Sequence, residues 1–215
     1  MDIEKLRQDQ LSLAKKVILS DMLGSIRRIA GADQAYIDDN TILSVIVIVD
    51  IKTQEVLDKK YTMGKCPLQY IPGFLSYREA PTIIETNSKL KEDYDLIIVE
   101  GNGILHPRKI GLASYVGIHI NKPTIGISKS LLCGEVSGNS VYLDKDVIGK
   151  VVKPYEYTKP LFVSPGHLIS LKRSYEIVKS LFIKPYKLPY PLAQANKYAK
   201  KLKKKFREER ISSKT

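Results

Sequence analysis

The sequence predicts an α/β protein with one mixed β-sheet, in which three antiparallel strands are followed by parallel strands and helices cover both faces. Two observations predict this class. The first third of the chain carries three consecutive β-branched segments joined by short polar turns, and the middle alternates helical patterns with short apolar segments. Because strands that alternate with helices pair in parallel through crossover connections, the second part of the sheet is expected to be parallel.

The antiparallel part is expected directly after an N-terminal helix. Apolar residues recur at helical spacing over residues 3–18, which predicts that amphipathic helix. Strands are then expected at residues 28–37, 42–50 and 55–62. Polar turn residues at 38–40 and 52–54 separate them, so these strands are predicted to form an antiparallel meander.

The rest of the chain contains the alternating elements. Helices are expected at residues 76–90, 109–120, 167–182 and 192–207. Buried strands are expected at 95–100 and 123–128, a strand pair at 136–143 and 147–152, and a short strand at 162–163. We interpret Ser164-Pro165-Gly166-His167 as a cap between that last strand and the next helix, with a supporting role for His167.

Length and charge restrict the domain organisation and the class of partner. A chain of 215 residues fits a single domain over residues 1–215. Its net charge of +12 favours a polyanionic partner such as nucleic acid or an acidic membrane surface. A basic tail from about residue 197 holds nine Lys/Arg and two Glu, and therefore carries +7 of that charge. This tail is either solvated and disordered or a phosphate contact.

The cysteine count and hydropathy restrict the compartment. Cys66 and Cys133 form no CxxC pair and have no histidine at metal-ligand spacing, so neither a disulfide framework nor a zinc site is indicated. The longest apolar run, residues 45–49, is too short to span a bilayer, and the N-terminus does not resemble a signal peptide. A soluble cytoplasmic protein without membrane contact is therefore predicted. We also expect a monomer.

Three acidic residues are candidates for divalent-metal chemistry. Asp33 lies inside the first predicted strand, where it either faces outward or is compensated by a cation. Glu100 ends the next core strand, so the two carboxylates converge if those strands are neighbours. Glu79, near a helix start, is a third carboxylate, although acidic residues near helix N-termini often only stabilise the helix. Oxygen ligands without a His or Cys cluster favour Mg²⁺, or Mn²⁺, which supports phosphodiester hydrolysis.

Two motifs are unusual enough to indicate a family. Residues 70–79 read Tyr-Ile-Pro-Gly-Phe-Leu-Ser-Tyr-Arg-Glu, in which a stiff aromatic turn leads into a helix. Residues 100–108 read Glu-Gly-Asn-Gly-Ile-Leu-His-Pro-Arg and follow an apolar strand, with the His-Pro-Arg-Lys segment predicted to open the following helix. Together they resemble endonuclease V, the deoxyinosine repair nuclease, and the resemblance extends from about residue 29 to residue 205.

The resemblance implies an RNase H-like fold and a specific reaction. An endonuclease V-like hydrolase binds double- or single-stranded DNA that contains deoxyinosine and flips the hypoxanthine base out of the stack. It then hydrolyses the second phosphodiester bond 3′ to the lesion, leaves 3′-hydroxyl and 5′-phosphate ends, and thereby initiates DNA repair. Purified protein with Mg²⁺ is therefore expected to nick a deoxyinosine duplex.

The resemblance also assigns roles residue by residue. Asp33 and Glu100 match metal ligands, Glu79 matches the catalytic glutamate, and Lys129 matches a lysine next to the scissile phosphate. Tyr70 matches the wedge that fills the gap left by the flipped base. The remaining positions that match DNA or base contacts are Ile71, Pro72, Gly73, Leu75, Gly101, His106, Arg108, Gly111 and Leu112.

Two positions depart from the family pattern. Glu100 stands where typical members have Asp, which lengthens the side chain by one methylene. Asn196 stands where the family has His or Asp, and its amide cannot exchange a proton near neutral pH, although its oxygen can bind a metal or a water. These departures leave two alternatives open. One is an inosine-specific endoribonuclease on the same scaffold, which acts on RNA, and the other is a catalytically weakened protein that binds the lesion.

Overall fold

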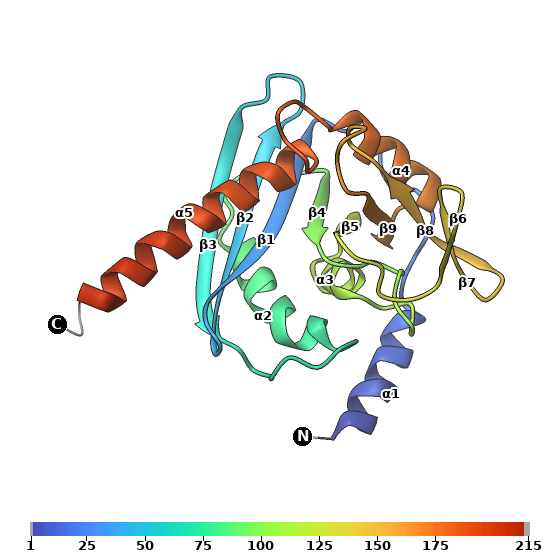
Figure 1. Cartoon of the computed structure of the whole chain (residues 1–215), viewed down its shortest axis with the longest axis horizontal. Helices are drawn as coiled ribbons and strands as arrows, with labels where there is room; N and C mark the ends of the chain where they lie inside the picture. Colours follow the sequence, from blue (N-terminus) through green and yellow to red (C-terminus); the bar gives the residue numbers. More distant parts are fainter. Residues whose placement is uncertain (1, 213–215) are drawn as a thin grey trace.

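The computed structural model describes residues 2–212 and contains one large sheet (Figure 1). Within this range, nine strands are hydrogen-bonded in the order β3-β2-β1-β4-β5-β9-β8-β7-β6. The strands are β1 Arg28–Asp38, β2 Thr41–Asp50, β3 Val56–Lys65, β4 Leu96–Glu100, β5 Thr124–Ser128, β6 Glu135–Ser137, β7 Ser140–Leu143, β8 Asp146–Val152 and β9 Leu161–His167. The helices are α1 Ile3–Ala14, α2 Leu75–Ser88, α3 Leu112–Ile120, α4 Leu171–Ser180 and α5 Tyr190–Ser212.

The strand pairing has the predicted mixed character. β1 is antiparallel to β2, and β2 is antiparallel to β3, as the polar turns indicated. β1 is parallel to β4, and β4 is parallel to β5. β9 returns antiparallel to β5, and β8, β7 and β6 extend that side of the sheet. The predicted order of antiparallel strands followed by parallel strands is confirmed.

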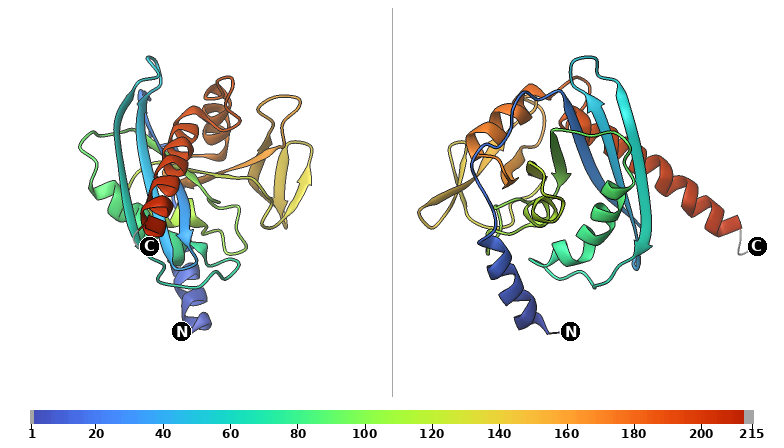
Figure 2. Two further views of the ribbon diagram at one scale, coloured as in Figure 1. Left: turned by 60° about the vertical axis from the view of Figure 1, so that its left-hand side comes forward. Right: turned by 180° about the vertical axis from the view of Figure 1, so that it is seen from behind.

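Helices cover both faces of the sheet, as predicted (Figure 2). On one face α2 and α3 bury a layer that includes Ala30, Ala32 and Ile97. On the other face α4 and α5 cover the side chains that point the opposite way, such as Ile29 of β1 and Ile98 of β4. Because side chains alternate along a strand, each residue of β1 and β4 can be assigned to a face by its position in the sequence.

A close backbone contact brings α5 onto the sheet. A Cβ atom at Gly31 would lie 2.3 Å from the backbone carbon of Pro191, so only glycine allows the first turn of α5 to approach β1 so closely. Asp33 lies two residues further along the same face of β1. The approach of α5 therefore places this helix directly over the position of Asp33.

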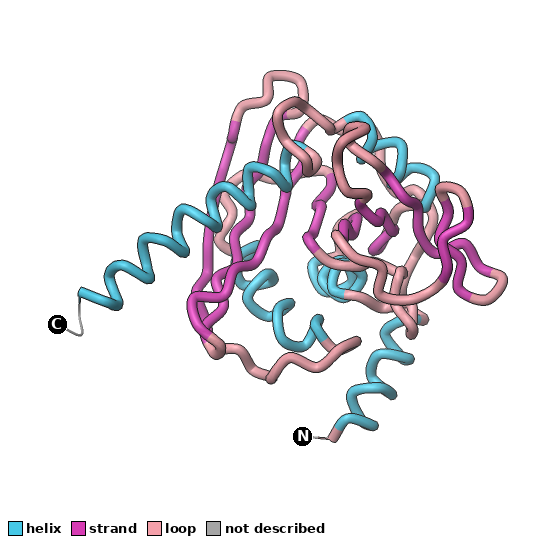
Figure 3. The backbone as a smooth tube through the Cα atoms, viewed as in Figure 1, coloured by secondary structure: helices cyan, strands magenta, loops and turns pink. Residues whose placement is uncertain are grey.

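Figure 3 shows how helices, strands and loops follow each other along the backbone, and several of their boundaries differ from the sequence predictions. The first helix ends at Ala14 and not at residue 18, and the predicted strand 136–143 is divided into β6 and β7 by a turn at Gly138, whose φ is +58°. The predicted cap at residues 164–167 is wrong, because these residues belong to β9 and Ser170 caps α4 through its side chain. His167 is buried, and its Nδ1 accepts a hydrogen bond of 3.2 Å from the backbone N–H of Ile18, so it holds the N-terminal segment.

The prediction that His106-Pro107-Arg108-Lys109 opens a helix is also wrong. These residues form an irregular turn in which Lys109 has a φ of +52°, and α3 begins only at Leu112 after Gly111 at its N-cap. The turn therefore reaches its surroundings through the side chains of His106 and Arg108.

The described part of the basic tail is helical. α5 continues to Ser212 and extends beyond the edge of the sheet (Figure 1). Arg207 donates a hydrogen bond of 3.1 Å to the carbonyl of Ile37, and Arg210 forms an ion pair with Asp38. The interpretation of the tail as disordered is thus wrong through residue 212, whereas residues 213–215 lie outside the described range.

Candidate active site

Asp33 and Glu100 come together because their strands pair in parallel. The register aligns Ala32 with Val99, so the next residues, Asp33 and Glu100, lie side by side at the carboxyl end of the pair. Both residues face α5, since their neighbours Ala32 and Val99 belong to the opposite core layer. The sequence-based expectation that these two carboxylates converge at one edge is met by the strand register.

The surroundings of this pair do not fully compensate two negative charges. Burial and the neighbouring Glu100 raise the pKa of Asp33 to about 8. Glu100 forms an ion pair with Lys129 through Oε1, but its other oxygen, Oε2, is buried and has no hydrogen-bond partner. Asn196 donates a hydrogen bond of 3.0 Å from Nδ2 to Asp33 Oδ2. The four residues Asp33, Glu100, Lys129 and Asn196 are therefore grouped in one site.

A divalent cation would supply the positive charge and the oxygen contacts that the two carboxylates lack. A buried carboxylate oxygen without a partner carries a large desolvation cost, and two adjacent carboxylates repel each other. Oxygen ligands of this kind suit Mg²⁺ or Mn²⁺. Within residues 2–212, however, no group of three or more His, Cys, Asp and Glu side chains is arranged to hold a metal. The chain thus supplies two close carboxylates, and the remaining ligands would be waters, amide oxygens or substrate oxygens.

Glu79 reaches the same edge from the opposite side of the sheet. It lies on α2, which packs on the Ala30 and Ala32 face, and it is only 6% exposed. The hydroxyl of Tyr36 donates a hydrogen bond of 2.5 Å to Glu79 Oε1. Burial raises the pKa of Glu79 to about 7, and repulsion from Glu100 adds to this increase. Glu79 is therefore close enough to Glu100 to feel its charge, but it is held by a different helix on the other face of the sheet.

Arg78, the residue before Glu79, is part of this arrangement and is not exposed on the surface. Its side chain is buried, and its Nε donates a hydrogen bond of 3.1 Å to the Tyr36 hydroxyl. It also donates to the carbonyl oxygens of Asp39 at 2.7 Å and of Leu68. Arg78 thus ties the β1–β2 turn and the segment before Tyr70 to the phenol that holds Glu79.

A cavity of about 300 Å³ opens beside Glu100 and Lys129. This volume is at the lower end of the range for small-ligand sites. Its lining includes seven of the residues that the motifs indicated, namely Tyr70, Gly73, Leu75, Gly101, His106, Gly111 and Leu112. Ile71, Pro72 and Arg108 were indicated too but do not line it. We call this space the base-sized cavity.

The carbonyl oxygen of Gly73 fixes one wall of the base-sized cavity. Gln10 Nε2 donates to it at 2.9 Å, Arg108 Nη2 donates at 2.8 Å, and His106 Nε2 lies 3.0 Å away. Burial lowers the pKa of His106 to about 4, so this ring is neutral near pH 7. Because its Nδ1 accepts from the backbone N–H of Arg108 at 3.2 Å, the proton resides on Nε2 and is donated to Gly73.

The backbone conformation and the close neighbours of residue 73 require a glycine at this position of the loop. Its φ is +79°, and a Cβ atom there would lie 2.9 Å from Arg108 Nη2. Tyr70, three residues earlier, is 66% exposed and has no ring contact within the described structure, which is the placement expected of a side chain that inserts into another molecule. The rigid Gly73 turn therefore carries a free aromatic ring next to the base-sized cavity.

Sequence reasoning missed three residues of this site. Gln10 is fully buried and also accepts a hydrogen bond from Arg108 Nε, yet in the sequence it is one polar position on an amphipathic helix. Tyr36 was seen only as a strand residue, although its position on the Ala30 and Ala32 face was a usable signal. Asn102 lines the base-sized cavity with a buried Oδ1 that has no hydrogen-bond partner.

Comparison with known proteins identifies the family. The family model described as endonuclease V matches residues 11–197. The chain belongs to the endonuclease V family. Endonuclease V of Dictyoglomus thermophilum is 39% identical over 200 residues, which cover 89% of this chain and 87% of that protein.

Solved endonuclease V structures have the same fold. The Bacillus subtilis endonuclease V structure superposes with a TM-score of 0.89 and 31% identity, covering 97% of this chain and 95% of that one. The Ciona intestinalis enzyme, solved with a 24mer DNA containing an inosine followed by a ribo-adenosine, has a TM-score of 0.85 and 26% identity, with coverage of 95% and 98%. The RNase H-like nuclease fold predicted for this chain is thereby confirmed. None of the helices within residues 2–212 contains an apolar stretch that could span a bilayer.

Proposed function

We propose that this protein is a metal-dependent endonuclease that recognises deoxyinosine in DNA and hydrolyses the second phosphodiester bond 3′ to the lesion. The observation that carries the proposal is the paired carboxylates Asp33 and Glu100, with a partnerless oxygen, next to a base-sized cavity and an exposed Tyr70. Membership of the endonuclease V family and the inosine-containing complex of the Ciona enzyme support the choice of lesion. The reaction would begin repair of the damaged strand.

The metal would be held by Asp33 and Glu100. When bound, Mg²⁺ or Mn²⁺ activates water and stabilises the oxygen that leaves during in-line attack on phosphorus. The unpaired Oε2 of Glu100 and the raised pKa of Asp33 both fit a bound cation, because a cation favours the ionised carboxylates. Asn196 orients Asp33 through the Nδ2 hydrogen bond and leaves its own amide oxygen free to accept from water.

The other residues bind, orient and exchange protons. Tyr70 fills the space left by the extruded base, and the base enters the cavity beside Gly101 and Leu112. Lys129, released from Glu100, neutralises a phosphate oxygen next to the cleaved bond. Glu79, with a pKa of about 7, is suited to accept a proton from the attacking water near neutral pH. Tyr36 stabilises the ionised form of Glu79 by its hydrogen bond.

Cleavage of a defined duplex tests the proposal. A deoxyinosine duplex with a labelled strand should be nicked at the second bond 3′ to the lesion with Mg²⁺ or Mn²⁺, and a matched deoxyadenosine duplex should stay intact. Equal cutting of both duplexes, or no cutting with either metal, would contradict it.

A second candidate is cleavage of inosine-containing RNA. The observation that favours it is the ribo-adenosine after the inosine in the DNA bound to the Ciona enzyme. Strands that differ only in a 2′-hydroxyl next to the cleaved bond separate the two functions. Faster cleavage of the all-deoxy strand supports the repair nuclease, whereas a requirement for the 2′-hydroxyl supports the ribonuclease.

A third candidate is a lesion-binding protein with a weakened site. The observation that favours it is that both departures, Glu100 and Asn196, occur in the carboxylate group, and that Lys129 neutralises Glu100. The double variant Glu100→Asp with Asn196→His restores the family pattern and is the discriminating protein. A large gain over near-zero activity of the natural chain supports a decayed site, and comparable activities support a working enzyme.

A further inference from the structure

A second concave surface adjoins the carboxylate site on the side away from the base-sized cavity. It is a groove of about 730 Å³ that contacts Lys129 and Asn196 of the candidate active site. Its outer part is formed by Tyr157, Lys159, Lys187, Lys197 and Lys200, and we call it the tyrosine-lysine groove. These residues come from the β8–β9 loop, the α4–α5 connection and the beginning of α5, so the groove is built by three separate segments.

The charge of the tyrosine-lysine groove is uncompensated. Its four outer lysines are exposed, and none forms a hydrogen bond or ion pair with a described side chain. No acidic residue lines the groove, although the exposed Glu156 lies on the same loop as Tyr157. By contrast, Lys204 and Lys205 further along α5 approach glutamates one turn away. Four free ammonium groups along one groove are suited to successive phosphates.

The same groove presents an aromatic face. Tyr157 is 74% exposed, and its ring stacks on Tyr155 with a centroid distance of 5.7 Å and an interplanar angle of 13°. Lys184 Nζ lies 5.8 Å from the centroid of the Tyr155 ring, so the inner ring is supported in turn. A flat ring that is already oriented by its neighbour needs little further ordering to stack on a base.

The position of the groove relates it to the cleaved strand. Lys129 borders both the base-sized cavity and the tyrosine-lysine groove, with the Asp33–Glu100 pair at the junction. A strand whose base occupies the cavity and whose backbone passes the carboxylates therefore continues into the groove. Bases within a duplex are stacked on each other, so the exposed face of the Tyr157 ring suits a strand that is unpaired there.

We propose that the tyrosine-lysine groove binds single-stranded DNA that continues from the cleavage site, with one base stacked on Tyr157 and the adjacent phosphates on the lysines. Only the placement of the cleaved strand rests on the proposed function. The binding of single-stranded DNA by the groove follows from its own charge and aromatic face.

The stacking contact is tested with an oligonucleotide that lacks inosine. Binding of a fluorescent oligothymidine to the full chain should weaken about tenfold in Tyr157→Ala, because one base loses the aromatic ring on which it stacks. Tyr157→Trp should retain the wild-type affinity. Tyr142→Ala is the matched control, since Tyr142 is also exposed but belongs to β7, outside the groove. A blunt duplex of equal length should bind the wild type and Tyr157→Ala equally.

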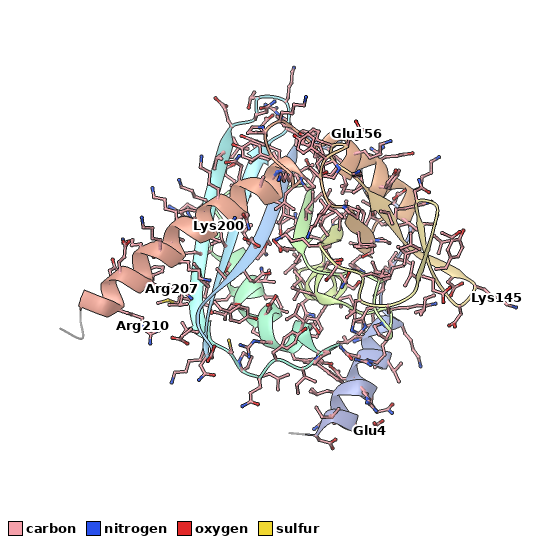
Figure 4. The ribbon with its side chains drawn as sticks, viewed as in Figure 1. Glu4, Lys145, Glu156, Lys200, Arg207 and Arg210 are labelled. Atoms are coloured by element: carbon pink, nitrogen blue, oxygen red, sulfur yellow. The ribbon has the colours of Figure 1, made fainter. Side chains whose placement is uncertain are left out.

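The phosphate contacts are tested by salt dependence. For the double variant Lys187→Ala with Lys197→Ala, the slope of log affinity against log salt should decrease by about 0.7 for each lysine removed. Lys145→Ala is the control, because Lys145 lies at the tip of the hairpin, far from Lys200 (Figure 4).

The outcomes separate this inference from the proposed function. Equal oligothymidine affinity of the wild type and Tyr157→Ala, or an equal loss in Tyr157→Ala and Tyr157→Trp, would overturn the stacking contact even if deoxyinosine is cleaved. An unchanged salt slope in the lysine variant would overturn the phosphate contacts. Absence of deoxyinosine cleavage by the wild type would instead overturn the proposed function and leave the oligothymidine result as it stands.

Discussion

The carboxylate pair Asp33 and Glu100 and the single carboxylate of Glu79 are held in different ways. Asp33 and Glu100 are placed by the backbone, because β1 and β4 pair in parallel and bring them side by side. Glu79 is placed by side chains, because α2 delivers it from the other face and Tyr36 and Arg78 fix it there. The strand-held pair lacks a partner for Glu100 Oε2, whereas Glu79 has its hydrogen bond. The difference supports the proposal that a cation completes the pair, and it fits the proposed role of Glu79 as an individual acid or base.

The largest effect on cleavage is expected when one carboxylate of the strand-held pair is removed. Asp33→Ala should reduce cleavage of a deoxyinosine duplex by about a thousandfold or more, because it removes one of the two proposed metal ligands, which would contribute several kcal/mol in the transition state. Binding to the same duplex should remain within a few-fold of wild type, since Tyr70 and the base-sized cavity are unchanged. Cleavage and equilibrium binding are measured side by side. Full activity in this variant would exclude Asp33 from the site.

A smaller effect is expected when Glu79 loses its ability to exchange a proton. Glu79→Gln should lower the cleavage rate by about a hundredfold, which is typical of a removed general base. Tyr36→Phe removes the hydrogen bond to Glu79 and the one from Arg78 Nε but leaves the carboxylate in place, and should lower the rate by about tenfold. Single-turnover rates distinguish the two variants. If Tyr36→Phe equals Glu79→Gln, the phenol itself takes part in the chemistry and the assignment of Glu79 changes.

The raised pKa of Glu79 also predicts a stability difference without metal. The pKa of this residue is raised from its ordinary 4.5 to about 7, so the folded state holds the proton more tightly than the unfolded state. The stability contributed by this proton is present below pH 4.5 and is lost as the pH rises to about 7. Relative to wild type, Glu79→Gln should therefore gain free energy of unfolding across this range and level off above it. Denaturant unfolding at several pH values measures this, and a constant difference would contradict the pKa assignment.

The smallest effect is expected at the wall of the base-sized cavity. Gln10→Ala removes one of three donors to the Gly73 carbonyl and should destabilise the protein by about 1–3 kcal/mol, since Arg108 also loses its acceptor. Cleavage should fall by only about tenfold, because His106 and Arg108 still hold the loop. Gln8→Ala, on the exposed side of α1, is the matched control. Equal behaviour of the two variants would show that Gln10 does not support the loop.

Sequence patterns predicted the strand-held part of the site better than the rest. The convergence of Asp33 and Glu100 follows from strand order and residue parity, which β-branched segments and intervening helices already indicate. The partners of Glu79 and Gly73 were not predictable, because Tyr36 and Gln10 are 43 and 63 residues away in the chain and are selected by side-chain packing. His167 was misassigned for a related reason, since the strand β9 continues through Pro165 and Gly166, which usually end strands.

Metal-dependent stabilisation of the wild type and Asp33→Asn, both without nucleic acid, tests the central claim most directly. Without metal and near neutral pH, Asp33→Asn should melt at a higher temperature than the wild type, because the raised pKa of Asp33, about 8, requires the wild type to bind a proton on folding and the amide does not. Saturating Mg²⁺ or Mn²⁺ should raise the melting temperature of the wild type and leave that of Asp33→Asn nearly unchanged. An equal metal-dependent shift in both proteins, or none in the wild type, would contradict a cation held by Asp33 and Glu100.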